Sequence, residues 1–175
     1  MVSVFVVAAA ILFLGLAHAE PVPFNSCING DNILSLSIEP CNPVLVDDWA
    51  TCVLQHGSEV NVEAAFIAPF DSSELETVSF ANIASRLVPL PATGTDPCIG
   101  DLSPSCPIKE GRMYIYSTIF DILKYFPAVN TARGPMEVMF SIRDRNSKST
   151  VGCAKLPVII QRNPSFTYKK RNISS

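Results

Sequence analysis

The sequence predicts an all-β protein, an immunoglobulin-like sandwich of two β-sheets with seven or eight strands. Two observations support this fold class. Apolar and polar residues alternate with a period of two along several short runs, which is the pattern of a strand with one buried face. Clusters of Gly, Pro, Asn and Asp separate these runs, and no segment has the long apolar stripe of an amphipathic helix.

Four runs carry the alternation most clearly. The residues expected to share a buried face in each run are Leu34, Leu36 and Ile38; Val60, Val62, Ala64 and Phe66; Met136, Val138, Phe140 and Ile142; and Leu156, Val158 and Ile160. Turn signals such as Asn29-Gly30-Asp31 and Arg133-Gly134-Pro135 stand between the runs. Each run is therefore expected to turn one face toward a common core.

The segment from Met113 to Phe126 breaks this rule because it is apolar on both faces. One face would carry Tyr114, Tyr116, Phe120, Ile122 and Phe126, and the other Met113, Ile115, Ile119 and Leu123. Two explanations fit the pattern. Either a central strand is covered by a loop or a partner subunit, or part of this surface lines an internal apolar cavity. Periodicity alone does not separate them.

The first residues predict a secreted protein. Residues 4–17 are apolar but shorter than the roughly 20 residues of a membrane-spanning helix. Ala17-His18-Ala19 then supplies a small-x-small cleavage signal, so we expect a signal peptide over 1–19, with a retained signal anchor as the alternative. Residues 20–163 are then one domain. Residues 164–175 are expected to be a basic, flexible tail in which Asn172 is a glycosylation site.

Six cysteines follow the leader, and an even number in an oxidising compartment predicts three disulfides. Six cysteines allow 15 pairings. The most economical pairing by spacing is nested, with two short clips and one long link. The pairs would be Cys41–Cys52, Cys98–Cys106 and Cys27–Cys153.

The sequence contains no recognisable catalytic or metal-binding motif. After the leader, His56 is the one histidine, so a Ser-His-Asp triad or a zinc site lacks its usual group. The pair Asp47-Asp48 does not have the spacing of a calcium loop. A net charge of −3 argues against a nucleic-acid partner. We therefore expect no enzyme, metal or cofactor, although two carboxylates that meet only in space would escape this search.

Several motifs, taken in order, resemble the ML family of lipid-recognition proteins, most closely its Niemann-Pick C type-2 branch. The motifs are Glu20-Pro21-Val22-Pro23-Phe24-Asn25-Ser26-Cys27, Glu39-Pro40-Cys41, Val88-Pro89-Leu90-Pro91, Asp96-Pro97-Cys98, Cys106-Pro107-Ile108-Lys109, Phe126-Pro127 and Leu156-Pro157-Val158. The resemblance spans nearly the whole chain after the leader. It implies the same three disulfides, and a sandwich whose sheets separate to hold one lipid, typically a sterol, in an apolar tunnel.

The resemblance also assigns pocket residues. Leu90 stands in the proline-rich loop where the sterol-binding branch has Phe, and Phe140 stands near the position of a pocket Trp. Ile122 and Phe126 replace a Val and a Tyr of that branch. Together with the two-sided segment, these positions give the expected lipid-binding set: Phe66, Val88, Leu90, Tyr114, Tyr116, Phe120, Ile122, Phe126 and Phe140.

The preferred function is a secreted, monomeric carrier of a sterol or similar apolar lipid, which it transfers between membranes or to a receptor. The receiving partner would be a membrane surface or a lipid-receiving membrane protein, and an endosomal or lysosomal lumen is the alternative location. A second hypothesis is recognition of microbial lipids in innate immunity, or carriage of hydrophobic semiochemicals. A third is a structural or adhesive domain whose core is filled.

Overall fold

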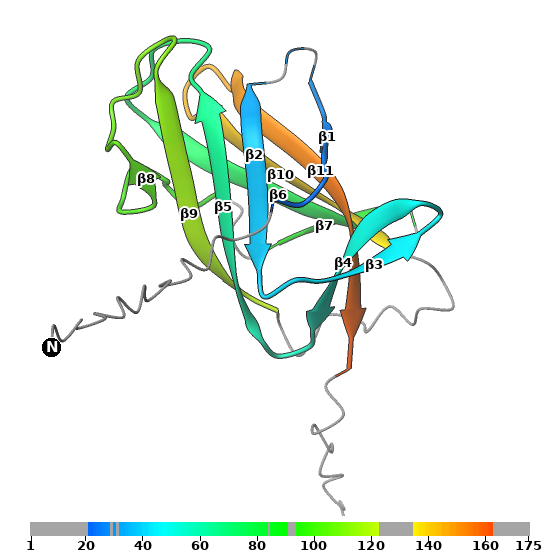
Figure 1. The fold of residues 1–175 in the computed structure, drawn as a ribbon. Helices are drawn as coiled ribbons and strands as arrows, with labels where there is room; N and C mark the ends of the chain where they lie inside the picture. Colours follow the sequence, from blue (N-terminus) through cyan, green and yellow to red (C-terminus); the bar gives the residue numbers. More distant parts are fainter. Residues whose placement is uncertain are drawn as a thin grey trace, which may run out of the picture.

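The computed structural model describes residues 21–28, 30, 32–83, 85–90, 94–122 and 135–162. Within these ranges the chain forms β-strands and no helix, and the strands lie in two sheets packed face to face (Figure 1). The predicted all-β sandwich is confirmed. The described part has eleven strands rather than seven or eight, in part because three strands of two to four residues pair at the margins of the sheets.

The two sheets differ in width. The large sheet has the order β3 (Asn42–Val46), β4 (Trp49–Gln55), β11 (Thr150–Gln161), β10 (Met136–Asp144), β6 (Leu75–Ile83) and β7 (Arg86–Pro89), with β1 (Asn25–Ser26) paired to β11. The small sheet has the order β2 (Ile33–Glu39), β5 (Glu59–Ile67), β9 (Met113–Asp121) and β8 (Leu102–Ser103). Strand β2 is therefore an edge of the small sheet, on the side where the β3–β4 hairpin projects (Figure 1).

Strand β5 shows how the alternating sequence builds the core. Val60, Val62, Ala64 and Phe66 are buried, whereas the intervening Glu59, Asn61, Glu63 and Ile67 are exposed. Successive side chains of a strand point to opposite faces, so this pattern places one face of β5 against the large sheet and the other in water. The prediction for this run is confirmed.

Strand β2 corrects one prediction. Leu34 is 52% exposed, and Ile33 takes the buried position instead. The register between β2 and β5 shifts between Ile33 and Ser35. An extra residue in one strand of a pair reverses which neighbours face inward, and an alternating sequence does not reveal it. Beyond the shift, Leu36 and Ile38 are buried as expected.

Strand β9 keeps its apolar residues on both faces. Tyr114 and Tyr116 point into the sandwich and are fully buried. The outward face carries Met113, Ile115 and Ile119, which are all exposed. No described part of the chain covers this outward face, where Ile119 is 68% exposed. The strand ends at Asp121, so the predicted continuation to Phe126 lies outside the described residues.

The six cysteines form three disulfides in the nested arrangement. Cys27–Cys153 links residues 126 positions apart and ties the chain after β1 to β11. Cys41–Cys52 joins the connection between β2 and β3 to the inner face of β4. Cys98–Cys106 closes a loop before β9. The first of these disulfides constrains the unfolded chain most, because it closes the longest loop.

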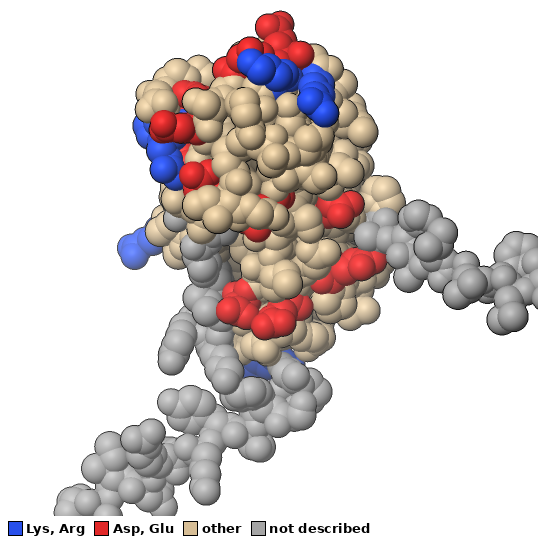
Figure 2. Space-filling model, turned by 90° about the vertical axis from the view of Figure 1, so that its left-hand side faces the viewer, with Lys and Arg blue, Asp and Glu red and all other residues tan. Residues whose placement is uncertain are grey.

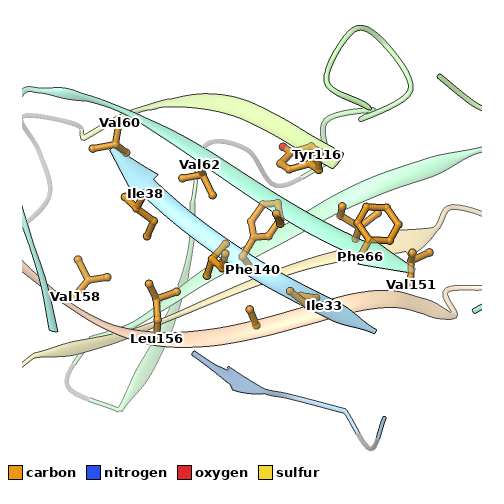
Figure 3. Close-up of a cluster of buried hydrophobic side chains, with 14 of the residues drawn as sticks. Ile33, Ile38, Val60, Val62, Phe66, Tyr116, Phe140, Val151, Leu156 and Val158 are labelled. Carbon is orange, nitrogen blue, oxygen red and sulfur yellow. The ribbon is translucent and has the colours of Figure 1, made fainter. Parts of the chain in front are cut away.

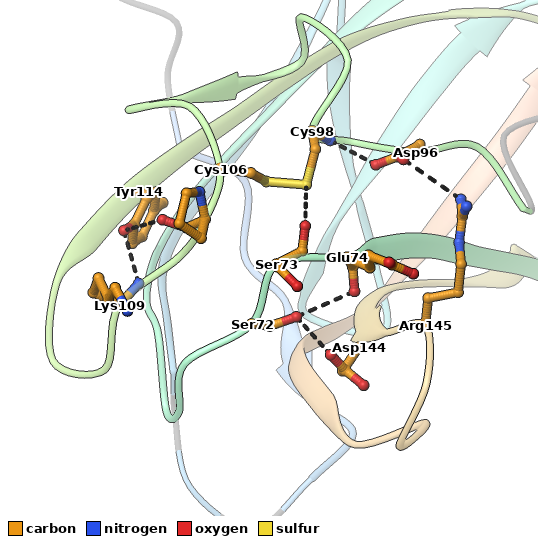
Figure 4. Close-up of a disulfide and its surroundings, with 11 residues drawn as sticks. Ser72, Ser73, Glu74, Asp96, Cys98, Cys106, Lys109, Tyr114, Asp144 and Arg145 are labelled. Atoms are coloured by element: carbon orange, nitrogen blue, oxygen red, sulfur yellow. Dashed lines mark hydrogen bonds and ion pairs between the residues drawn. A yellow bond between two sulfur atoms is a disulfide. The ribbon is translucent and has the colours of Figure 1, made fainter.

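Polar contacts hold the end of the sandwich near the Cys98–Cys106 disulfide (Figure 4). Asp96 accepts a hydrogen bond from the Cys98 backbone N–H at 2.9 Å and lies 3.7 Å from the Arg145 guanidinium. The Ser72 hydroxyl donates to Asp144 at 2.6 Å and lowers the pKa of that carboxyl to about 2. The Asp96–Arg145 and Ser72–Asp144 contacts join loops that are far apart in the sequence.

Candidate functional site

An apolar cavity of about 90 Å³ lies between the two sheets. The small sheet and the residue after it contribute Leu36, Ile38, Val60, Val62, Phe120, Asp121 and Ile122 to its wall. The large sheet and the residue after β7 contribute Leu54, Ser79, Ala81, Leu90, Met136, Val138, Phe140, Leu156, Val158 and Ile160. Among the described lining residues, all but Ser79 and Asp121 have apolar side chains, so the wall suits an apolar guest.

The cavity occupies one half of the sandwich. On β5, Val60 and Val62 line it, whereas Ala64 and Phe66 do not. On β9, Phe120 lines it, whereas Tyr114 and Tyr116 do not. Figure 3 shows the same division, with Val60, Val62 and Ile38 toward one end and Phe66 and Val151 toward the other. The inner faces of the sheets therefore pack on each other in one half and leave space in the other.

Three aromatic rings stand at the boundary between the two halves. Phe140 of β10 lies between Tyr116, at a ring-centroid distance of 5.2 Å, and Phe120, at 6.0 Å. The Phe120 ring meets Phe140 edge to face. Phe140 and Phe120 line the cavity, and Tyr116 lies behind Phe140. These contacts are of the kind that stabilise aromatic pairs beyond their buried area.

Tyr116 carries an unusual buried hydroxyl. Among the described residues, this hydroxyl has no partner with hydrogen-bond geometry. Burial raises the pKa of Tyr116 to about 12; the neighbouring Thr118 side chain opposes the rise and the Asp101 charge adds to it. Thr118 lies near the hydroxyl without reaching hydrogen-bond geometry, so the hydroxyl is unsatisfied among the described residues. An unsatisfied buried polar group destabilises the folded state.

Three backbone hydrogen bonds place the predicted residues Leu90 and Ile122 against the cavity. The Leu90 N–H donates to the Ser79 carbonyl at 2.9 Å, which holds the residue after β7 over the sheet. Ile122 exchanges backbone hydrogen bonds of 2.8 Å with Ser58 and Gly57. Gly57 has a φ of 80°, a conformation that glycine adopts without strain. The turn after β4 thus fixes Ile122 at the end of β9.

The structure brings together part of the predicted lipid-binding set. Leu90, Phe120, Ile122 and Phe140 line the cavity. Phe126 lies outside the described residues, as does the predicted glycosylation site Asn172. The remaining members of the predicted set, Phe66, Val88, Tyr114 and Tyr116, do not line the cavity.

The positions of these four residues explain why they do not line the cavity. Phe66 and Tyr114 stack at 5.8 Å in the half where the sheets pack together, and Tyr116 lies behind Phe140. Val88 pairs with Ala81 but lies on the edge strand β7, where it is 38% exposed. All four residues of β7 are exposed, so Val88 contacts solvent rather than the cavity.

Sequence reasoning missed thirteen lining residues, most of them aliphatic. They are Leu36, Ile38, Leu54, Val60, Val62, Ser79, Ala81, Asp121, Met136, Val138, Leu156, Val158 and Ile160. Nine of them belong to the alternating stripes that predicted buried strand faces. Alternation identifies an inward side chain, but it does not show whether that side chain meets another side chain or a cavity.

No group of three or more His, Cys, Asp or Glu side chains in the described ranges could hold a metal ion. The same part of the chain contains no helix long and apolar enough to cross a membrane. On the side that Figure 2 views, Asp and Glu are scattered over the described surface and Lys and Arg form no continuous patch.

The sequence is similar to that of several known proteins. A sequence profile of the ML domain matches residues 21–160. The chain is 35% identical over 79 residues to the ecdysteroid-regulated 16 kDa protein of Manduca sexta, an alignment that covers 45% of this chain and 54% of that protein. It therefore spans about half the length of this relative. The chain is also 28% identical over 111 residues to mite group 2 allergen Lep d 2 of Lepidoglyphus destructor, covering 62% and 72% of the two chains.

A solved structure agrees with the sequence match. The crystal structure of a Niemann-Pick type C2 protein from Japanese carpenter ant superimposes with a TM-score of 0.66 at 23% identity, covering 79% of this chain and 99% of that chain. This similarity shows the same fold. The profile match includes every described residue that lines the cavity. The chain therefore belongs to the ML-domain family.

Proposed function

We propose that this protein binds one apolar lipid between its two sheets and carries it through an aqueous compartment. The observation that carries the proposal is the apolar cavity of about 90 Å³, which residues of both sheets line. A filled structural domain does not need such a space. Membership of the ML-domain family supports a binding role rather than a catalytic one.

The chemistry of the wall fits this role. Lipid binding without catalysis needs apolar surface to be removed from water, which contributes about 25 cal/mol per Å². A lipid of sixteen carbons or more would bury on the order of several hundred Å² of apolar surface. The free energy gained is enough for tight binding even after the entropic cost of ordering the lipid and the lining side chains is subtracted. The two polar lining residues, Ser79 and Asp121, come from different sheets.

The size of the cavity adds a requirement. Ligand pockets usually enclose roughly 300–1,000 Å³. The 90 Å³ between the sheets is smaller, so a lipid enters only if the lining moves. The edge-to-face pair of Phe120 and Phe140 is the bulkiest part of the wall. We expect Phe120 to move first, because it is partly buried whereas Phe140 is buried.

We further propose that the bound lipid is a sterol or a similar lipid and that the protein is secreted. This proposal is supported by the resemblance of the pocket positions and by the predicted signal peptide over residues 1–19. We expect the domain to extend over 20–163, the tail over 164–175 and the protein to act as a monomer. A lipid-receiving membrane, or a protein in that membrane, would be the second partner.

The test measures displacement of a fluorescent sterol and a fluorescent fatty acid from the purified full chain. The variant Val138→Phe adds a ring inside the cavity, and Met139→Phe adds the same type of ring at the next residue of β10, which does not line the cavity. We expect Val138→Phe to lose binding of both probes and Met139→Phe to retain it. Failure of the unaltered protein to bind either probe would contradict the proposal.

A further inference from the structure

A second hollow, of about 310 Å³, lies on the large sheet between the β3–β4 hairpin and the strands β10 and β11. The hairpin that forms one of its walls projects from the sandwich (Figure 1). The volume of the hollow is at the lower end of the usual range for ligand pockets, roughly 300–1,000 Å³. Unlike the internal cavity, it has both apolar and charged lining residues.

The hollow opens where one edge of β11 changes its partner strand. Lys155 pairs with Asn25 of β1, and Val158 is the first residue of β11 to pair with β4. Between these two pairs, Leu156 and Pro157 have no partner on that edge among the described strands. Strand β10 occupies the opposite edge. Because proline has no backbone N–H, Pro157 cannot donate a hydrogen bond that would extend the pairing with β4.

The hollow lies outside the space between the sheets. Glu137 and Lys155 line the hollow and alternate along β10 and β11 with residues that line the internal cavity, so they lie on the outer face of the sheet. Met136 and Leu156 line both spaces and are only 3% and 4% exposed. These two buried side chains therefore form the wall between the hollow and the cavity.

Hydrogen-bond donors and acceptors stand together around the hollow. The Glu137 carboxylate lies 3.9 Å from the Lys155 ammonium, and the two side chains are 53% and 38% exposed. Asp47 adds a second carboxylate from the hairpin turn, and Asn25 adds an amide. A carboxylate only accepts, an ammonium only donates, and an amide does both. Hydroxyl groups both donate and accept, so a ligand with several hydroxyls suits this set.

Trp49 gives the hollow an accessible aromatic surface. It pairs with Val46 across the hairpin turn, lines the hollow and is 38% exposed. Val46, Pro135 and Pro157 add further apolar surface. An indole ring offers a large apolar surface for packing. The hollow thus combines an apolar surface with a rim of hydrogen-bonding groups.

We propose that this hollow binds a neutral saccharide at a site separate from the lipid cavity. The apolar C–H face of a sugar ring packs on the Trp49 indole, and its hydroxyls pair with the rim. The described lining has two carboxylates and one ammonium, so an acidic sugar meets net repulsion. The Lys155 ammonium in turn disfavours an organic cation. The site adds a second ligand to the protein and does not depend on the proposed function.

The emission of Trp49 reports binding at this site directly, because the chain contains one tryptophan. The test titrates the full chain with the methyl glycosides of glucose, galactose, mannose and N-acetylglucosamine. Glucuronic acid, choline and the open-chain sorbitol are the comparison compounds. We expect at least one glycoside to shift the emission to a saturating value, and each comparison compound to require about tenfold higher concentrations or more.

Two matched pairs of variants locate the sugar. Asp47 and Asp48 both have a positive φ, of 50° and 62°, so glycine fits either position without strain, but Asp48 does not line the hollow. Asp47→Gly should weaken binding about tenfold, and Asp48→Gly by less than about twofold. Calorimetric titration replaces fluorescence for Trp49→Ala, which should lose binding. Leu45→Ala, on the same hairpin and exposed but outside the hollow, should retain it. Thermal unfolding verifies that each variant is folded.

Val138→Phe separates this inference from the proposed function, because it adds a ring inside the internal cavity. The sugar titration of this variant should stay within about twofold of the unaltered protein. Loss of the sugar response in Val138→Phe would place the sugar in the cavity and overturn the inference. No response to any glycoside, an equal response to sorbitol or choline, or equal losses in Asp47→Gly and Asp48→Gly would also overturn it. None of these results bears on whether the internal cavity binds a lipid.

Discussion

Phe120 of β9 and Phe140 of β10 meet edge to face across the two sheets, with ring centroids 6.0 Å apart, and both rings line the cavity. This contact limits how far the internal space extends toward the packed half of the sandwich. A lipid larger than the space requires the lining to move, and these two rings are its bulkiest part. The contact between the two rings stabilises the folded state, whereas binding of a lipid requires the rings to move apart.

The first prediction follows from that opposition. Phe120→Leu removes the edge-to-face contact and should lower the free energy of unfolding by about 1 kcal/mol. The same change enlarges the cavity, so less rearrangement precedes binding and the affinity for a fluorescent sterol should rise. Ile119→Leu, at the next residue but on the exposed face, should change neither quantity. Chemical denaturation and probe titration measure the two effects, and a parallel loss of both would contradict the role of the ring.

The second prediction compares two buried tyrosines of one strand. The Tyr114 hydroxyl accepts a hydrogen bond from the Lys109 backbone N–H at 2.9 Å (Figure 4), whereas the Tyr116 hydroxyl has no partner among the described residues. Tyr114→Phe should therefore destabilise the protein by about 1 kcal/mol, and Tyr116→Phe should stabilise it by about 1 kcal/mol. Equal losses in urea unfolding would show that the Tyr116 hydroxyl is satisfied, for example by a bound water.

The third prediction concerns alkaline pH. Burial raises the pKa of Tyr116 from 10.0 to about 12, so the folded state holds this proton more tightly than the unfolded state does. Stability from this group is complete below pH 10 and is lost as the pH rises toward 12, by about 2 kcal/mol in total.

The difference between the unaltered protein and Tyr116→Phe isolates this contribution. The free energy of unfolding of the variant should fall less steeply over the same pH range. Identical pH profiles for the two proteins would mean that Tyr116 titrates normally when folded.

The fourth prediction ranks the disulfides. Replacing Cys27 and Cys153 by Ser opens a link across 126 residues and should lower the free energy of unfolding by about 5 kcal/mol. Replacing Cys98 and Cys106 opens a link across 8 residues and should lower it by about 2.5 kcal/mol. Denaturant titration under identical conditions gives both values, and the reverse order would contradict the chain-entropy explanation.

The fold could be predicted from the sequence because each strand repeats a local signal. Val60 to Phe66 alternate in the sequence and alternate in burial. The exposure of Leu34 could not be predicted, because a shift in pairing register depends on the neighbouring strand and not on the residues of β2 alone.

The cavity was harder to predict for a geometric reason. Val62 and Phe66 lie on the same strand and the same face, yet only Val62 lines the cavity. The separation of the sheets decides between them, and that separation arises from contacts of all the strands together. The resemblance identified Leu90, Ile122 and Phe140, because it relates positions across whole chains.

The central claim is that the space between the sheets holds a lipid. The most direct measurement is mass spectrometry of an organic-solvent extract of the full chain, purified after secretion from a eukaryotic host. We expect one apolar lipid per protein molecule, lost in Val138→Phe and retained in Met139→Phe. An empty extract from the unaltered protein, together with no displacement of a sterol or fatty-acid probe, would show that the core is filled and that the claim is wrong.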